Sequence, residues 1–414
     1  MRIEKYTIGM GDRFAHEGQA QLQAVLDAWA AGIKVFPVWN KSNREHTLVK
    51  SHPNDLRVEA DRATQNLGWT RPYYVDADHI ALKTVDAFLD SCNFYTIDVA
   101  EYRGMPAEAA AIEHFVHALD KYSGPLLIPG IPAPLQITHE VVYGTARKFL
   151  LAIREAGNIY RHIEHIKGRG RFVTEISIDE TDSPQTPAEL FLILAMIGLE
   201  RIPAQTIAPR FTGRFNKGVD YSGEISKFAR EFDENLSVIA FAIREFSLPD
   251  TLKLSVHSGS DKFSIYPDIN RLIKKHHAGL HVKTAGTTWL EEVIGLAESG
   301  GEGLAIAKDI YTGACARFGE LTGPYASVVD IEKGRLPSPG DVAGWDSCKF
   351  ANTLRHVPSC PDYNSDFRQL LHVAFKVAAE MEGRFTGALI ANREHIARNV
   401  TANLFQRHIK PIFG

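Results

Sequence analysis

A histidine and a lysine lie within a run of small polar residues in the segment SVHSGSDKFS, which comes directly after the apolar run TLKL. A surface turn would explain the serines and the glycine, but it explains His257 and Lys262 less well. An imidazole can ligate a metal ion or carry a proton near neutral pH, and an ammonium group can bind an anion. The segment is therefore a candidate functional loop, and its meaning depends on the residues at the ends of the other strands.

Three histidines lie in or beside apolar runs of β type. His79 ends YYVDADH, His257 follows LKLSV, and His281 lies early in LHVKT. Three neutral imidazoles suit zinc, manganese, iron or nickel and leave coordination positions open for a substrate. The spacing is not a metal signature by itself, so each histidine could instead be a hydrogen-bonded structural residue. For His281 that alternative places it in the interior, next to Lys283.

Acidic residues near the ends of two such runs could supply an acid and a base. Asp78 belongs to DADH and Glu180 to IDET, and we expect their strands on different sides of the fold. Two carboxyl groups that face each other across a substrate can act as base and acid on opposite faces of one carbon centre. Asp76 and Asp179 are alternative members of the pair, because adjacent residues of a strand point in opposite directions.

Cations are also frequent near the ends of these runs, and they outnumber what two carboxylates need. This surplus predicts an anionic substrate. The sequence has no glycine-rich phosphate loop, so a carboxylate held by arginine or lysine is as good a candidate ligand as a phosphate. The residues that we expect to contact the substrate are Asp12, Arg13, Lys41, Asn43, Arg44, Asp179, Ser258, Lys262 and Lys283.

Eight short β-branched and aromatic runs alternate with amphipathic helical stretches, which is the pattern of βα units around a parallel sheet. The runs begin at Tyr6, Lys34, Pro72, Phe94, Phe172, Ala204, Leu252 and Leu280. Eight such units predict an α/β fold of the TIM (β/α)8 barrel type. An open doubly wound sheet is the alternative, but no G-x-G-x-x-G follows the first run. In a barrel the carboxyl ends of all strands meet at one rim, so the polar segments would converge.

Two segments exceed a minimal barrel. We expect residues 1–300 to form the catalytic barrel, with a long helical insertion near 102–169 between its fourth and fifth strands. Residues 301–414 contain apolar residues at helical spacing and predict a C-terminal helical extension. This extension is expected to pack on the barrel, where it would cap it or make a contact in a homo-oligomer.

The composition excludes several classes of protein. The chain has 414 residues, 44% of them hydrophobic, and a formal net charge of −4, with basic and acidic residues interspersed. This argues against nucleic-acid and membrane partners, which leave basic stripes or long apolar runs. The 4 cysteines form no C-x-x-C pair, which argues against a zinc ribbon or a disulfide framework. A cytoplasmic location is the simplest expectation, and a small anionic molecule is the expected partner.

Five segments resemble the bacterial tagaturonate epimerase family, which interconverts tagaturonate and fructuronate. They are VWNKSNREHT, YYVDADHIALKTVD, FYTIDVA, SVHSGSDKFSIYP and HVKTAGTTWLEE, and the similarity extends over nearly the whole chain. The resemblance implies a TIM barrel that depends on one divalent metal ion. It also implies that Asp78 is the proton acceptor, that Glu180 is its acid partner, and that His79, His257 and His281 are metal ligands.

The chemistry implied by this resemblance needs two carboxyl groups and a Lewis acid. The two ketohexuronates differ at a hydroxyl-bearing carbon one bond beyond the position adjacent to the ketone, so enolisation alone cannot invert it. Retro-aldol cleavage, rotation of the aldehyde and re-formation of the bond can do so. The alternatives are a metal-dependent aldolase or ketose isomerase acting on another sugar acid or sugar phosphate, and a sugar-acid-binding barrel without catalysis.

Overall fold

A closed barrel of eight parallel strands forms the centre of the protein, in a computed structural model that describes residues 1–181, 183–284 and 286–414. The order around the barrel is β1-β10-β9-β8-β7-β4-β3-β2. The strands are β1 (Tyr6–Gly11), β2 (Phe36–Ser42), β3 (Tyr74–Ile80), β4 (Phe94–Asp98), β7 (Val173–Ile178), β8 (Thr206–Pro209), β9 (Lys253–His257) and β10 (Leu280–Lys283). Each of the eight predicted runs overlaps one of these strands, and the predicted TIM barrel is confirmed.

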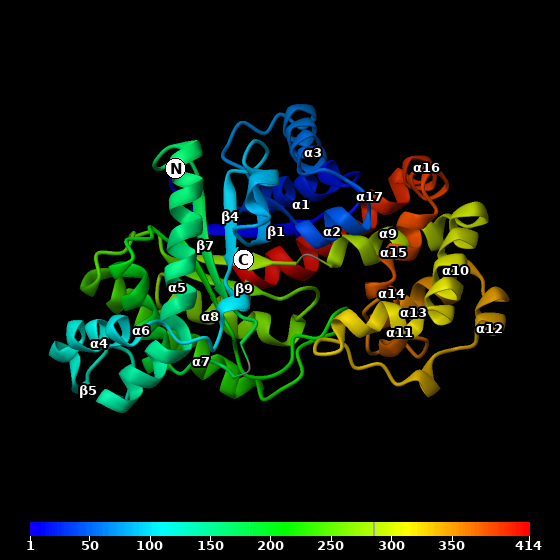
Figure 1. Ribbon diagram of the computed structural model, residues 1–414. Coiled ribbons are helices and arrows are strands. Elements are labelled where there is room, and N and C mark those ends of the chain that lie inside the picture. The colour runs from blue at the N-terminus through cyan, green and yellow to red at the C-terminus, as the bar shows by residue number, and fades with distance from the viewer. Residues whose placement is uncertain (182, 285) are drawn as a thin grey trace.

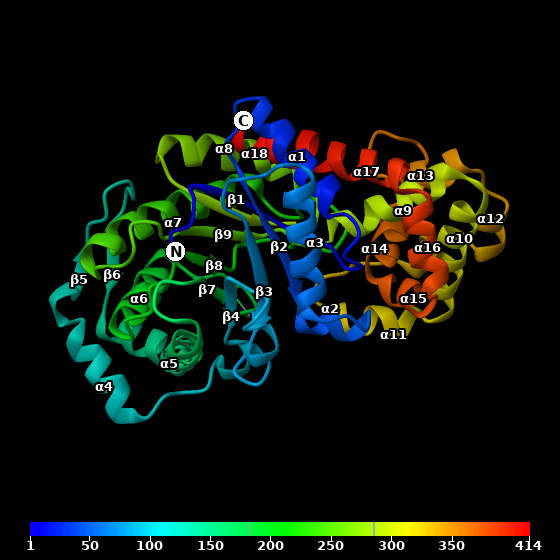
Figure 2. The same cartoon turned by 90° about the horizontal axis from the view of Figure 1, so that it is seen from above.

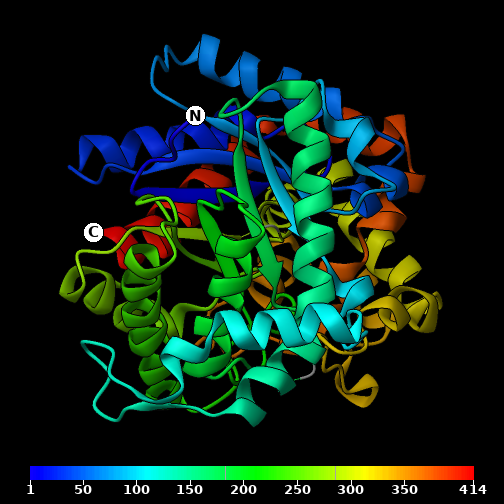
Figure 3. The same ribbon diagram turned by 60° about the vertical axis from the view of Figure 1, so that its left-hand side comes forward.

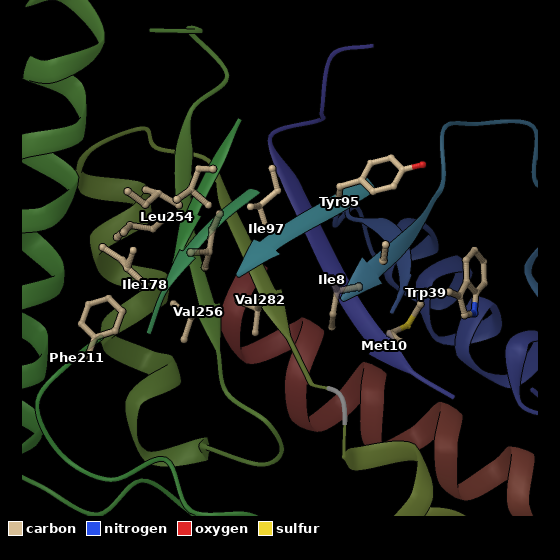
Figure 4. Close-up of a cluster of buried hydrophobic side chains, with 14 of the residues drawn as sticks. Ile8, Met10, Trp39, Tyr95, Ile97, Ile178, Phe211, Leu254, Val256 and Val282 are labelled. Carbon is tan, nitrogen blue, oxygen red and sulfur yellow. The ribbon is translucent and has the colours of Figure 1, made fainter. Parts of the chain in front are cut away.

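Alternation along each strand separates an apolar outer layer from a more polar interior. Ile8, Val256 and Val282 are buried between the barrel and its helices, and Figure 4 shows part of this layer. Tyr74 and Phe94 belong to a second apolar cluster that forms the floor of the barrel interior. Two residues further along β3 and β4 the inward side chains are Asp76 and Thr96. The interior therefore becomes polar toward the carboxyl ends of the strands.

Helices surround the barrel and bury their apolar faces against the outer layer (Figure 1). Those that come after barrel strands are α1 (Gly18–Ala30), α2 (Asn43–Leu48), α3 (Pro53–Asn66), α5 (His139–Lys167), α6 (Pro187–Leu199), α7 (Ile225–Glu245), α8 (Tyr266–Lys275) and α9 (Thr287–Ser299). The segment after β3 contains a 3-10 turn, Val85–Phe88. The short polar segment 43–48 forms a helix because Ser42 and Glu45 form a reciprocal capping box.

A long segment joins β4 to β7, at the place where the sequence predicts an insertion. It contains α4 (Ala109–Ala118) and a hairpin of β5 (Gly124–Leu126) with β6 (Leu135–Ile137). The rest of the segment 102–169 is mostly α5, a 29-residue helix that buries one apolar face and packs on α6 and β4 as the barrel's own helix. Figure 3 shows α4, in cyan, crossing close to one end of α5.

The residues after α9 are helical and form a second body beside the mouth of the barrel (Figure 2). They are α10 (Gly301–Ala316), α11 (Phe318–Thr322), α12 (Pro339–Ala343), α13 (Ser347–Leu354), α14 (Ser365–Val373), α15 (Phe375–Glu380), α16 (Gly383–Ala391), α17 (Arg393–Ala402), a π-helix (Asn403–Ile409) and α18 (Lys410–Phe413). The chain then returns to the barrel, because α17 packs on α1 and α9 and α18 packs on α8. Within the described residues, no helix combines the length and apolar character needed to cross a bilayer.

Candidate active site at the carboxyl ends of the strands

An extra residue in β3 brings two neighbouring side chains into the mouth of the barrel. β3 pairs with β4 at Asp76 and Ala77, but the pairing shifts by one residue before it resumes at Ile80. His79 has a φ of 53°, in the left-handed region that few side chains adopt. A β-bulge of this kind re-aims a side chain. As a result Asp78 and His79 both reach the site, although simple alternation would place them on opposite faces of the strand.

Two imidazoles and a carboxylate meet above this bulge. His79, Asp179 and His257 each present one ligand atom, and these atoms all lie within 4.8 Å of one another. The ring centroids of His79 and His257 are 5.1 Å apart. Nδ1 of His257 lies 2.9 Å from Asp179 Oδ2, and Nε2 of His79 lies 3.9 Å from Asp179 Oδ1. The donor set N, N and O is one that divalent transition metals accept.

Each imidazole also contacts a buried carboxylate through its second nitrogen. Nδ1 of His79 lies 2.9 Å from Asp78 Oδ1, and Nε2 of His257 lies 2.8 Å from Glu175 Oε1. Carboxylates in this position fix the tautomer and the ring orientation of metal-binding histidines. The nitrogens left over, Nε2 of His79 and Nδ1 of His257, are the two directed toward Asp179.

Lys283 lies beneath these residues at the centre of a buried ion cluster. Its ammonium group is 2.7 Å from Asp76 Oδ2, 2.8 Å from Asp78 Oδ1 and 2.9 Å from Glu175 Oε1. It also donates to Thr96. Asp179, which contacts the two imidazoles, adds a fourth carboxyl group to the site. This excess of negative charge favours an additional cation at the site.

The ionisation of the site is set by this crowding. Burial alone would raise the pKa of Asp78, but Lys283 and His79 hold it well below its usual range. Burial, opposed by Lys283, raises the pKa of Asp76 to about 7. Burial alone would lower the pKa of His257, but Asp179 and Glu175 raise it to about 9. The cluster therefore holds Asp78 as an ionised carboxylate.

His281 lies outside this cluster of ligands. It pairs in register with Ser255, two residues below the pairing of Lys283 with His257, which is roughly 7 Å lower in the barrel. Its Nδ1 lies 2.9 Å from the Thr7 hydroxyl and its ring is 5.2 Å from that of Phe94 in the barrel floor. Burial lowers the pKa of His281 to about 3, so it is a neutral interior residue. Asp179 takes the place among the imidazoles that the sequence suggested for His281.

The sequence suggested that Glu180 and Asp78 lie on opposite sides of the barrel, but they do not. Only β4 lies between β3 and β7 in the barrel. In a closed barrel of eight strands, two strands on opposite sides are four positions apart. The two carboxyls differ in depth instead, because Asp78 is buried and Glu180 is exposed at the rim. Glu180 lines a small cavity together with Asp98 and Arg103.

The predicted substrate contacts from the β1 and β2 ends lie together on another part of the mouth. Arg13 is buried, with Nε 3.3 Å from Glu45 and its guanidinium over the Phe375 ring. Arg44 lies over the Tyr325 ring at 4.8 Å. Asn43, which precedes Arg44, is the first residue of α2.

Two residues of this group make their contacts inside the protein. Lys41 donates to the Arg13 carbonyl at 2.5 Å and to the Ser51 hydroxyl at 2.7 Å, and burial lowers its pKa to about 8. Asp12 accepts a hydrogen bond from the Glu17 backbone at 2.7 Å.

Three more of the predicted contacts have internal partners that account for them. Lys262 is fully buried, and its ammonium group donates to the carbonyls of Asn216, Val219 and Asp261. The Ser258 hydroxyl donates to the Lys283 carbonyl at 2.7 Å. Lys283 has its acidic partners, as described above. These three residues hold loops and strands in place, and their contacts do not support a direct role in substrate binding.

The structure also brings in residues that the sequence did not single out. Glu175 is an inward carboxyl in the middle of the run FVTEISI, and an acid within a buried strand is the signal that could have found it. Lys217 and His372 lie at the mouth as well, the latter from α14. α14 begins at Ser365, far beyond the end of β10 at Lys283, so no local signal shows that one of its histidines returns to the barrel.

The fold and the site together define a class of protein. A closed βα barrel whose strand ends gather acids, imidazoles and cations in one place is an enzyme of the TIM-barrel type. The tagaturonate epimerase family matches residues 1–387 of this chain. The chain therefore belongs to the tagaturonate epimerase family, a family of carbohydrate epimerases, which are isomerases.

Individual relatives agree with this assignment. The chain is 26% identical to the tagaturonate/fructuronate epimerase of Thermotoga maritima, over 99% of this chain and 81% of the relative. The glycerol-bound crystal structure of the fructuronate-tagaturonate epimerase from Cohnella laeviribosi is 24% identical, with a TM-score of 0.81 over 100% of this chain and 82% of that chain. The native crystal structure of the same protein gives a TM-score of 0.79 at 24% identity and the same coverage. Both structures share the fold of this chain.

Proposed function

We propose that this protein interconverts tagaturonate and fructuronate with the help of a divalent metal ion held by His79, Asp179 and His257. The observation that carries the metal site is the paired use of each imidazole. One nitrogen contacts a buried carboxylate and the other is directed at Asp179. The substrates come from the family and from the relative in Thermotoga maritima, which is a tagaturonate/fructuronate epimerase.

The donor set and the charge both fit a divalent cation. Two imidazole nitrogens and a carboxylate oxygen suit zinc, manganese, iron or nickel and leave positions open for substrate oxygens. The excess of carboxylates around Lys283 supports the same conclusion. When bound, such a cation supplies Lewis acidity toward the keto oxygen and the neighbouring hydroxyl oxygen.

Asp78 is the proposed proton acceptor. Lys283 and His79 keep it ionised, and it lies beside the ligand atoms. It accepts the proton of the hydroxyl group at the carbon to be inverted. The bond between that carbon and the next carbon toward the ketone then breaks, so that an aldehyde forms and the electron pair stays on the keto fragment as an enediolate.

Glu180 is the proposed proton donor for the return step. The aldehyde turns its other face toward the enediolate, the carbon–carbon bond re-forms, and the new alkoxide takes a proton from a carboxyl group on its own side. Glu180 comes directly after Asp179 and is exposed, whereas Asp78 is buried. This difference in depth supports a base below the substrate and an acid above it.

Removal of the metal tests the first half of the proposal. Treatment with a chelator followed by desalting should abolish interconversion, and addition of one of the divalent ions should restore it. Full turnover in a preparation shown by elemental analysis to be metal-free would refute the metal site. Release of two three-carbon products in place of an isomer of unchanged mass would replace the epimerase with an aldolase.

Two isosteric substitutions test the carboxyl roles. Asp78→Asn and Glu180→Gln should each lower kcat by about 10²-fold or more, since a positioned acid or base contributes that much. Asp90→Asn and Glu113→Gln are matched controls on the exposed surface and should keep the wild-type rate. Near-normal rates in Asp78→Asn or Glu180→Gln, with the fold intact by circular dichroism, would remove that residue from the mechanism.

A further inference from the structure

Three loops of the barrel mouth and one helix of the C-terminal body meet around His372. Gly286, at the start of α9, donates its N–H to the Gly259 carbonyl at 2.8 Å. A Cβ atom on Gly286 would lie 1.8 Å from His372 Nε2, so the imidazole occupies the space directly over that glycine. Gly218, in the loop after β8, faces the same histidine, because a Cβ there would lie 3.4 Å from His372 Cβ. The glycines let α14 bring its imidazole against the loops.

The Nε2 atom of His372 is buried and has no hydrogen-bond partner in the part of the chain that the structure describes. The residue is only 2% exposed. A buried polar atom without a partner is unfavourable, so such an atom is a candidate contact for a ligand. Burial and the neighbouring cations Arg13 and Lys217 hold the pKa of His372 well below its ordinary value, so the ring is neutral and can donate one N–H.

The start of α9 offers further donors beside this imidazole. The helix has 13 residues and begins without a side-chain cap at Gly286. The hydroxyl of Thr287, its first residue, is fully buried and also lacks a partner among the described residues. The N–H groups of Gly286 and Thr287 already donate to the carbonyls of Gly259 and Thr284. The helix start therefore offers an anion the Thr287 hydroxyl and the positive end of the helix dipole.

Lys217 supplies positive charge at the same place. A Cβ atom on Gly259 would lie 3.5 Å from its Nζ, and Gly259 has a φ of 68°, which suits glycine. No carboxylate pairs with the Lys217 ammonium within residues 1–181, 183–284 and 286–414. Burial lowers the pKa of Lys217, and Arg44 and Arg13 lower it further, while Asp78 raises it. Lys217 therefore interacts electrostatically with the cations of the mouth and with the proposed base.

We propose that His372, Lys217 and the start of α9 form the subsite that binds the carboxylate end of the substrate. This inference rests on the proposed function for the identity of the substrate. Gly259 lies two residues beyond His257, so the backbone separates them by at most about 7 Å. A six-carbon acid has a comparable length, so its carboxylate can lie here while its keto end reaches the ligand atoms. The C-terminal body thereby contributes a residue to the barrel's active site.

Calorimetry with an unreactive acid tests the subsite directly. The probe is D-gluconate, a six-carbon carboxylate without a ketone, and D-sorbitol is its counterpart without a carboxylate. Wild-type protein should bind gluconate at least about tenfold more tightly than sorbitol. His372→Phe and Lys217→Met should each weaken gluconate binding by about tenfold or more, which corresponds to 1.4 kcal/mol, and leave sorbitol binding unchanged. Lys227→Met, on the exposed face of α7, is the matched control and should match the wild type.

Three outcomes would overturn the subsite. One is unchanged gluconate affinity in both folded variants. Another is an equal loss of gluconate and sorbitol binding, which would indicate a general disturbance of the pocket. The third is tighter binding of inorganic phosphate than of gluconate, which would assign the donors to a phosphate.

The proposed function is tested separately, by turnover of tagaturonate in the wild type. If the protein binds gluconate through His372 but does not turn over tagaturonate, the subsite is supported and the epimerase activity is refuted. In the converse outcome, the wild type turns over tagaturonate while His372→Phe and Lys217→Met bind gluconate as tightly as the wild type does. That result would support the epimerase activity and refute the subsite.

Discussion

In the Lys283 cluster one ammonium group is surrounded by Asp76, Asp78 and Glu175. In a second cluster one carboxylate, that of Asp261, is surrounded by an arginine and two histidines. Asp261 Oδ2 lies 2.7 Å from Arg368 and 3.0 Å from His356, and its Oδ1 lies 3.3 Å from His408. Both central residues are buried, so each cluster is built around one buried charged group.

They differ in what surrounds them. The Lys283 cluster borders His79 and His257, whose remaining nitrogens face the mouth of the barrel. The partners of Asp261 all come from the C-terminal body. Their contacts connect the loop after β9 to that body. A buried charge alone therefore does not mark an active site. What marks it is a ligand atom that remains open to a substrate or a metal.

Replacement of Lys283 should give the largest effect. Lys283→Met leaves three buried carboxyls without their cation, so the free energy of unfolding should fall by about 3–5 kcal/mol. In the folded fraction, turnover should fall by about 10²-fold, because displacement of Asp78 by 1 Å costs that much. Chemical denaturation and steady-state kinetics measure the two effects.

Lys253 provides the control for that substitution. It is also a buried lysine on a barrel strand, but it lies at the opposite end, where it donates to the Glu4 and Lys5 carbonyls. Lys253→Met should lower stability and leave turnover of the folded protein unchanged. Equal losses of turnover in both variants would show that the two ends of the barrel do not differ in function as proposed.

Replacement of Asp261 should affect stability without affecting the metal. Asp261→Ala leaves the fully buried Arg368 unpaired, so the free energy of unfolding should fall by about 3–5 kcal/mol. Metal affinity, measured by calorimetry on the folded protein, should stay at the wild-type value. A large loss of metal affinity would show that the clusters are coupled, contrary to the comparison.

Substitutions of Glu175 and His281 should differ in their effect on metal affinity, because Glu175 contacts a proposed ligand and His281 lies at the barrel floor. Glu175→Gln should weaken metal binding by about 10–100-fold, the usual cost of losing a carboxylate that orients a metal-binding histidine. His281→Gln should change metal affinity by less than about threefold, well below that cost. If His281→Gln gave the larger loss, His281 would be a ligand and Asp179 would not.

Acid unfolding gives the smallest of these effects. Burial alone would raise the pKa of Asp261, but Arg368 and His356 hold it well below its usual range. Its folded-state pKa is therefore below the unfolded value of about 3.9. The unfolded chain binds more protons in that window, so this stabilisation is present above about pH 4 and is lost as the pH falls further. Wild-type stability should decline more steeply below pH 4 than that of Asp261→Asn, and parallel curves would contradict the assignment.

Much of the barrel could be predicted from local patterns. The eight runs of β-branched and aromatic residues are short, apolar and separated by amphipathic stretches, and each overlaps a strand of the barrel. The pattern was weaker where structure depends on capping. The polar segment beginning at Asn43 forms a helix through the Ser42 capping box, which apolar periodicity does not indicate.

The candidate site was predicted in part for the same reason. His79, His257, Asp78 and Asp179 stand at strand ends, and the fold brings strand ends together. The alternation rule gives no warning of the bulge that turns His79 inward beside Asp78. It places His281 and Lys283 on one face but does not give their depth in the barrel.

The order of residue types along this chain determined an eight-stranded parallel barrel and a polar rim, because side-chain alternation and helical periodicity are local properties. Only the tertiary structure decided which polar groups have partners inside the protein and which remain available to a ligand. Lys262 and Lys283 look alike in sequence, yet one holds three carbonyls and the other gathers three carboxylates. His372 reaches the mouth from a distant helix for the same reason: depth, partners and long-range contacts are set by packing, which no short stretch of sequence encodes.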